Sequence, residues 1–340
     1  MTSTDTPAFP PKGKRFFTSP VLLAGVFAWV TLNVTALILA GGYLPFDRPA
    51  LAGIPFAVQM AIPTVGMIQI FAMMGLVWWL TRRRAPVDMG ARAPEKTRAA
   101  WEMMALLAYA MLGQAGGWLL GPALGYRAFS FHIAGTLVGC SRLASPGEAI
   151  TWCVYNFIVF AVIPYLWFRR RYSNLQLNLK SVAPMSDAWV ILVVGVVEAT
   201  TEFLTLPGIT KLSPHALLLA APLSFGLFFF GTVLPTMVLI YAILLPRYMK
   251  LTGSMTATVI LGGLTYAVMH MVEGWSSFAN PRDTALSLIF VFLTYTSPGM
   301  FKAYFTLRTG NAWAHAIGYH IFAPHVIVDT PMIAHVFGIE

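Results

Sequence analysis

The stretch WVILVVGVVEATTEFLTL, residues 189–206, is almost entirely apolar, yet it carries Glu198 and Glu202. Its length approaches the roughly 20 residues that an α-helix needs to cross the hydrocarbon core of a bilayer. An ionised carboxylate at that depth costs about 2.5 kcal/mol or more, so it persists mainly where it is paired, metal-bound or functional. The stretch therefore predicts a membrane-spanning helix that contributes to a polar site.

The composition of the whole chain agrees with a membrane protein. Apolar residues make up 57% of the sequence and charged residues only 10%, which is far from the balance of a soluble domain. Alternating strand patterns of about ten residues are missing from the sequence, so we do not expect a β-barrel. We predict an all-α, polytopic transmembrane bundle of about eight to nine helices.

Apolar segments separated by polar or basic turns define these helices. The expected helices cover 20–42, 55–81, 100–123, 146–168, 187–206, 214–246, 254–273, 284–307 and 311–330. We further expect a disordered cytoplasmic tail over 1–18, the first four helices within 19–185, and a core with the polar site over 186–340.

Basic residues gather in short runs beside the apolar segments, at Lys12–Arg15, Arg82–Arg84 and Arg169–Arg171. All three runs face the cytoplasm if the amino terminus is cytoplasmic, as the positive-inside rule requires. We therefore assign the net charge of +9 to contact with lipid headgroups and expect no nucleic-acid partner. The prediction is a multi-pass protein of the bacterial inner (plasma) membrane, with the lipid bilayer as its partner; the sequence identifies no protein partner.

Further ionisable residues lie in apolar stretches near the carboxyl end. His270 and Glu273 stand in LGGLTYAVMHMVEGW, and His320 and His325 stand in WAHAIGYHIFAPHVIVD. Their helices run in the same direction in the expected topology, and a rise of about 1.5 Å per residue places these groups from the middle of the membrane to its outer half. The groups share a depth, as a common site requires.

The spacing of these residues indicates the chemistry that they can support. Glu198 and Glu202 are four residues apart and share a helix face, while Asp329 follows His325 by four, which suits a carboxylate that orients an imidazole. Carboxylates and imidazoles from several helices are ligands for zinc and non-haem iron. For any single residue, an interhelical hydrogen bond is the alternative explanation.

We therefore predict a divalent metal ion, zinc or iron, with three groups of residues around it. The predicted catalytic carboxylates are Glu202, Glu198 and Glu273. The predicted metal ligands are His270, His320, His325, Glu273 and Glu202. The predicted supporting residues are Tyr266 and Asp329.

Two motifs in the last third of the chain resemble those of a known family. The run YAVMH, from Tyr266 to His270, is similar to the motif FxxxH, and the run from Phe301 to His320 is similar to the stretch that enters a motif HxxxN. Over 225–330 the chain thus resembles the CPBP family, the CAAX proteases and bacteriocin-processing enzymes also called Abi proteins. The resemblance implies a membrane-embedded helical bundle with metal-dependent or glutamate-based peptidase activity.

The third family motif, EExxxR, is degenerate in this chain, and the last asparagine of the family is also replaced. The residues at those positions are Thr236, Met237, Tyr241 and Pro324. Replacement carboxylates would then come from Glu198, Glu202 or Glu273.

These observations lead to one principal functional prediction and two alternatives. We expect a CPBP-like, metal-dependent hydrolase of peptidase type that acts on a membrane peptide or lipid-like substrate entering laterally. One alternative is a non-catalytic binding or accessory subunit that keeps the same bundle. The other is a di-metal redox enzyme, which the number of carboxylates and histidines suggests.

Overall fold

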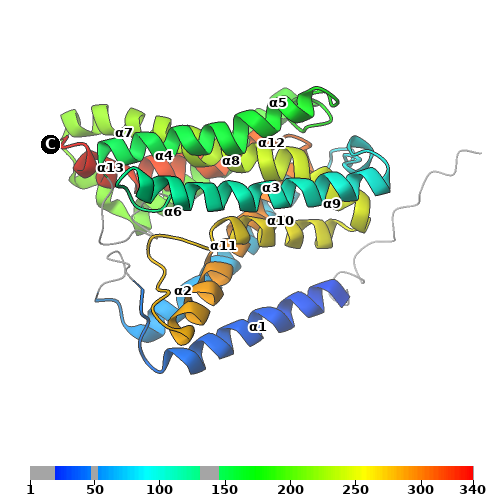
Figure 1. Ribbon diagram of the computed structural model, residues 1–340. Coiled ribbons are helices and arrows are strands. Elements are labelled where there is room, and N and C mark those ends of the chain that lie inside the picture. The colour runs from blue at the N-terminus through cyan, green and yellow to red at the C-terminus, as the bar shows by residue number, and fades with distance from the viewer. Residues whose placement is uncertain (1–19, 47–52, 131–144, 340) are drawn as a thin grey trace, which may run out of the picture.

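The chain folds into a bundle of helices (Figure 1). The computed structural model describes residues 20–46, 53–130 and 145–339, and no strand occurs in those ranges. Seven helices in them are long and apolar enough to cross a membrane. They are α1 (Pro20–Ala40), α2 (Phe56–Thr81), α3 (Lys96–Ala123), the helix Pro146–Arg169, α6 (Pro184–Thr205), the helix Pro214–Thr252 and α11 (Pro281–Thr309). The predicted all-α, polytopic bundle is confirmed, while the predicted tail over 1–18 lies outside the described residues.

The two remaining expected spans are helical but shorter or interrupted. Helix α10 (Met255–Met269) is apolar and has 15 residues. The last span is divided into α12 (Ala312–His315), the π-helix η7 (Ala316–Val328) and α13 (Thr330–Val336). All nine expected spans are therefore helical, although only seven have the length and composition of a full crossing.

The helix Pro214–Thr252 forms the centre of the bundle, because 83% of its most apolar window is buried. It begins as α7 (Pro214–Phe228) and ends as α9 (Leu245–Thr252). Between them lies the π-helix η6 (Met237–Leu244), in which every residue is buried. Wide π turns accommodate prolines within a continuous helix, so the chain crosses the core without a break.

Helices α10 and α11 touch through their backbones. A Cβ atom added at Gly263 would lie 2.6 Å from the carbonyl oxygen of Thr296, and one added at Gly299 would lie 2.9 Å from the Cα atom of Gly263. Small residues permit this close approach between membrane helices. The crossing holds Tyr266 of α10 against Lys302 of α11, whose Nζ atom lies 3.7 Å from the centre of the Tyr266 ring.

Replacing Gly263 by alanine is expected to lower the free energy of unfolding by about 1–3 kcal/mol, because the added methyl group meets backbone that cannot move aside freely. Denaturant unfolding in detergent micelles measures the change. The matched control is Gly75→Ala in α2, where an added Cβ meets no atom within 4 Å. Equal unfolding midpoints for the two variants would contradict the close crossing.

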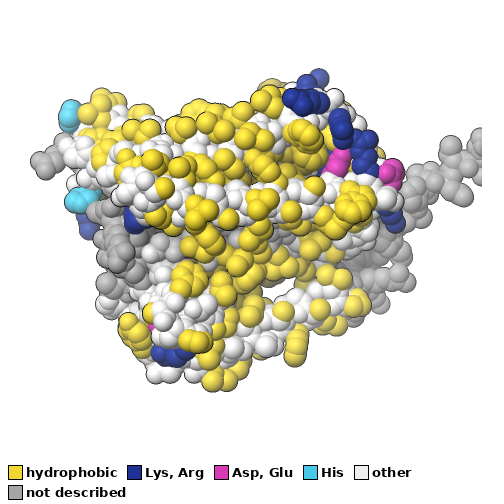
Figure 2. All heavy atoms as spheres, in the orientation of Figure 1, with side chains coloured by type: hydrophobic (Ala, Val, Ile, Leu, Met, Phe, Trp, Pro, Cys, Tyr) yellow, Lys and Arg dark blue, Asp and Glu magenta, His cyan; other side chains and the backbone are white. Residues whose placement is uncertain are grey.

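The surface has the polarity of a membrane protein. In Figure 2, apolar side chains cover the middle of the visible face, and Lys and Arg side chains gather at one end, near the end of α5 (Ile163–Arg169). Near that end, Arg84 forms a 2.6 Å ion pair with Asp187, which also accepts a hydrogen bond from Asn311. The protein is therefore an integral, multi-pass membrane protein in a lipid bilayer.

Candidate functional site

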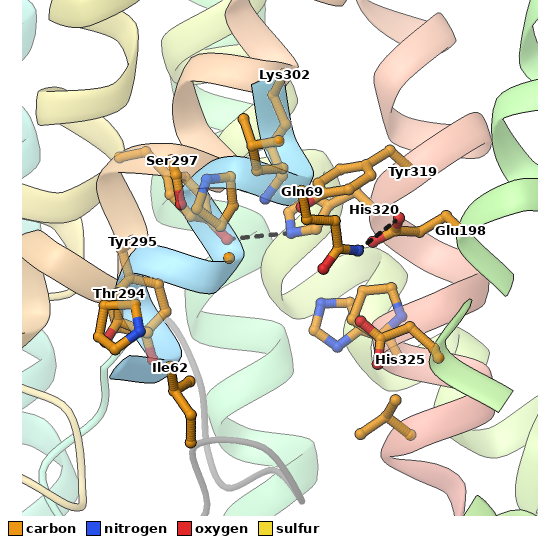
Figure 3. A pocket seen from close by; sticks show the side chains of 18 of the residues that line it. Ile62, Gln69, Glu198, Thr294, Tyr295, Ser297, Lys302, Tyr319, His320 and His325 are labelled. Carbon is orange, nitrogen blue, oxygen red and sulfur yellow. Dashed lines mark hydrogen bonds between the residues drawn. The ribbon is translucent and has the colours of Figure 1, made fainter. Parts of the chain in front are cut away.

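A cavity of about 230 Å³ lies between α2, α6, α10, α11 and η7 (Figure 3). Its wall includes several ionisable side chains, although the surrounding helices are apolar. These side chains are Glu198, Glu202, Tyr266, Tyr295, Lys302, Tyr319, His320, His325 and Asp329. The predicted glutamates of α6 and the predicted histidines of η7 therefore line one space.

Close packing of two glycines brings α6 and η7 together beside this cavity. A Cβ atom added at Gly195 would lie 3.5 Å from the carbonyl oxygen of Gly318, and one added at Gly318 would lie 3.2 Å from the Cα atom of Ile191. Glu198 follows Gly195 by almost one helical turn, and His320 follows Gly318 by two residues. The glycine contact thus places a carboxylate and an imidazole on facing segments.

The carboxylate wall of the cavity belongs mainly to α6. Glu198 is buried, and its carboxylate accepts a hydrogen bond from the Gln69 side-chain amide at 3.5 Å (Figure 3). Glu202, one turn further along, is half-buried and lines the same cavity. Glu198 is therefore held by a neighbouring helix, whereas Glu202 is the more accessible of the two acids.

The imidazole wall belongs to η7, and its π geometry explains why both histidines reach the cavity. Residues five apart in an α-helix point about 140° away from each other, but the wider turn of a π-helix brings residue i+5 back to nearly the same side as residue i. His320 and His325 are five apart, and their ring centroids are 5.3 Å from each other. Pro324 cannot donate a backbone hydrogen bond within this segment, which fits the wider turn.

Each of these two imidazoles has a supporting neighbour. The Tyr266 hydroxyl lies 3.4 Å from Nε2 of His320. His325 donates from Nδ1 to the Asp329 carboxylate at 2.9 Å, and its ring stacks on Phe228 with centroids 4.4 Å apart. Asp329 therefore contacts His325, beside which the sequence places it, whereas Tyr266, expected beside His270, reaches His320 as well.

His270 and Glu273, by contrast, do not line the cavity. Helix α10 ends at Met269, so the His270 side chain turns back and donates from Nδ1 to the Tyr266 carbonyl oxygen at 2.5 Å. The His270 ring stacks on Tyr295, with centroids 4.0 Å apart. His270 therefore contacts Tyr266 and Tyr295, which line the cavity, without lining it itself.

Three of the five predicted metal ligands, Glu202, His320 and His325, line the cavity, whereas His270 and Glu273 do not. In the ranges that the structure describes, no group of three or more His, Cys, Asp or Glu side chains is placed to hold a metal ion. We therefore derive no chemical step through a metal. The zinc or iron ion stays a prediction, which metal analysis of the purified protein would test.

The polar residues of the cavity wall that were not among the predicted site residues include Lys302 and Gln69. Lys302 is only 1% exposed, and Gln69 stands in the middle of the long apolar helix α2. A search for metal ligands passes over both, because neither residue type is a common ligand. The signal that could have found them is the cost of a polar side chain inside an apolar span.

No family model, curated protein or solved structure matches this chain. The likeness to CPBP proteins therefore stays a prediction from two motifs, and the geometry of the cavity carries the functional argument.

Proposed function

We propose that the protein is an intramembrane acid–base hydrolase, acting on a membrane peptide or a lipid-like amphiphile. The observation that carries the proposal is the shared cavity, in which two carboxylates of α6 face two imidazoles of η7. Pairs of acids and bases in a site largely closed to water are the groups that general acid–base catalysis uses.

Glu202 is the proposed general base. It accepts a proton from a water molecule while the water oxygen attacks the carbonyl carbon of the substrate. The Tyr266 hydroxyl and His320 donate hydrogen bonds to the oxygen that becomes negatively charged. His325, oriented by Asp329, donates a proton to the leaving nitrogen or oxygen when its bond to that carbon breaks. The products are a carboxylic acid and an amine or alcohol, and the cycle closes when the proton held by Glu202 passes to His325.

Lateral access from the bilayer is supported by the side of the cavity that α2 forms. Ile62, Gly66 and Gln69 line the cavity and are only half-buried. A Cβ atom added at Gly66 meets no atom within 4 Å, so the missing side chain leaves open space in this wall. A membrane-borne substrate would enter here without passing through water.

Membership of the CPBP family belongs to the same proposal. The supporting observation is that Tyr266 and His320, which come from the two matching motifs, lie 3.4 Å apart at the cavity. A cytoplasmic amino terminus in a bacterial inner membrane is likewise proposed. Its support is that the runs Arg82–Arg84 and Arg169–Arg171 lie at the carboxyl ends of α2 and α5, as the positive-inside rule expects of cytoplasmic ends.

Blocking the cavity tests the proposal without removing any polar group. Gly66→Trp is expected to abolish turnover, because the indole fills space that the substrate needs. Gly75→Trp, on the same helix, is the matched control and is expected to retain turnover, because open space surrounds that position as well and it does not line the cavity. Mass spectrometry of products formed by the reconstituted protein in vesicles of membrane lipids and peptides measures both.

The Gly66→Trp experiment also distinguishes the hydrolase from the two alternative functions. A non-catalytic accessory subunit gives no products with either variant, and Gly66→Trp then changes only the partners that co-purify. A di-metal redox enzyme gives an iron signal in absorbance or paramagnetic resonance spectra. Turnover that survives in Gly66→Trp would remove the cavity from the mechanism.

A further inference from the structure

Lys302 places a buried amine in the wall of the cavity, and neither the proposed general base nor the proposed general acid explains it. It lies in α11, eight residues after Thr294, and both residues line the cavity. Figure 3 shows its side chain entering the site from α11, while Glu198 enters from α6. Its Nζ atom lies 3.7 Å from the centre of the Tyr266 ring and 5.9 Å from that of Tyr319.

The protein itself would balance a positive charge on this amine only in part. Across the portion of the chain that the structure describes, no carboxylate oxygen lies within 4.0 Å of the Lys302 ammonium. The faces of Tyr266 and Tyr319 attract a cation, but an ammonium inside a membrane remains costly without an anion. The open space beside Lys302 is where such an anion would bind.

We propose that Lys302 binds an anionic oxygen group, a carboxylate or a phosphate, of the molecule that enters the cavity. The inference rests on the proposed function and narrows its substrate to an amphiphile with a negative charge near the bond that is cleaved. An ammonium acts as a point charge and suits either anion. Ser297 and Gln69, which line the same cavity, supply hydroxyl and amide donors for its remaining oxygens.

This charge arrangement orients the substrate. Lys302 comes from α11, while the carboxylates Glu198 and Glu202 come from α6. The anionic group is attracted by the lysine and repelled by the glutamates, so the neutral carbonyl group is left beside Glu202. Neutral or cationic amphiphiles of the same length lack this preference.

Photolabelling tests the inference directly. The full-length protein in phosphatidylcholine nanodiscs is exposed to three diazirine probes of equal chain length, namely a fatty acid, an alkyl phosphate and an alcohol. Labelling of peptides from α2, α11 and η7 is quantified by mass spectrometry. We expect at least one anionic probe to label the cavity at concentrations where the alcohol does not. Lys302→Met is expected to raise the half-saturating concentration of that anionic probe by roughly tenfold or more.

Three controls make the outcome decisive. Lys302→Arg keeps the charge and is expected to retain labelling, while Lys180→Met removes an exposed lysine that does not line the cavity. If Lys302→Met does not fold, competition in the wild-type protein still tests the inference. Unlabelled dodecanoate should then displace the anionic probe at lower concentrations than unlabelled dodecanol. Labelling by the fatty acid alone assigns a carboxylate, labelling by the phosphate alone assigns a phosphate, and labelling by both supports the shared chemistry.

Equal labelling by the alcohol and both anions, or unchanged labelling in a folded Lys302→Met protein, would overturn the inference. Glu202→Gln separates this failure from failure of the proposed function, since that variant should lose turnover and keep anion-selective labelling. Selective labelling of a wild-type protein without turnover would preserve the anion site and remove the hydrolase. Turnover without selective labelling would preserve the hydrolase and remove the anion site.

Discussion

Glu202→Gln is expected to lower turnover by about 10²–10⁴-fold while leaving the protein folded, because that range is typical for the loss of a general base. Glutamine keeps the length and shape of glutamate, but its amide cannot take a proton from water. The half-buried position of Glu202 in the cavity wall lets a water molecule reach it. Product formation by the reconstituted protein, compared at equal amounts of folded enzyme, measures the loss.

Glu198→Gln is the matched control for that experiment. Glu198 already holds a hydrogen bond from Gln69, and a glutamine at position 198 can accept the same bond through its carbonyl oxygen. The control is therefore expected to retain more turnover than Glu202→Gln. If the order is reversed, the base is Glu198; if both variants match the wild type, neither glutamate is the base.

The helices could be predicted from the sequence because span length and hydropathy are local properties. Depth could also be estimated, since the rise per residue of a helix is constant. Of the six residues that depth grouped, Glu198, Glu202, His320 and His325 line one cavity, and His270 and Glu273 do not. What depth cannot give is rotation about the helix axis. An α-helical spacing would have turned His320 and His325 apart, and only the π-helix places them together.

The end of α10 was the other feature that local patterns did not predict. The apolar run continues past Met269, so an extended helix over 254–273 was expected, whereas the helix ends before His270. The imidazole then bonds to the backbone of Tyr266, and the ring is not part of the cavity lining. The residue at which α10 ends goes together with contacts to α11, such as the stacking of His270 on Tyr295. The composition of the segment does not reveal such contacts.

A second polar cluster, away from the cavity, holds α3 and α9 together at the basic end of the bundle. Arg247 of α9 is fully buried, and its guanidinium donates from Nη2 and Nε to the Glu102 carboxylate at 2.6 and 3.0 Å. The guanidinium also lies 4.7 Å from the centre of the Phe168 ring and 4.9 Å from that of Tyr172. Burial and the hydrogen bond to Glu102 raise the pKa of Tyr172, so its hydroxyl stays protonated and donates to the same carboxylate.

Arg247→Met is therefore expected to lower the free energy of unfolding by about 3–5 kcal/mol, because it leaves the Glu102 carboxylate without its buried partner. Denaturant unfolding followed by tryptophan fluorescence measures the loss. The matched control is Arg98→Gln, since Arg98 pairs with the same carboxylate from a side chain that is 44% exposed, and removing an exposed ion-pair partner should cost far less stability.

The double variant Glu102→Gln/Arg247→Met separates the ion pair from the packing of the arginine side chain. Removing both charges leaves no uncompensated carboxylate, so the double variant should be more stable than Arg247→Met alone. If the double variant is no more stable, the loss comes from the contacts of Arg247 with Phe168 and Tyr172. If Arg247→Met unfolds at the same denaturant concentration as Arg98→Gln, the buried pair does not hold α3 against α9.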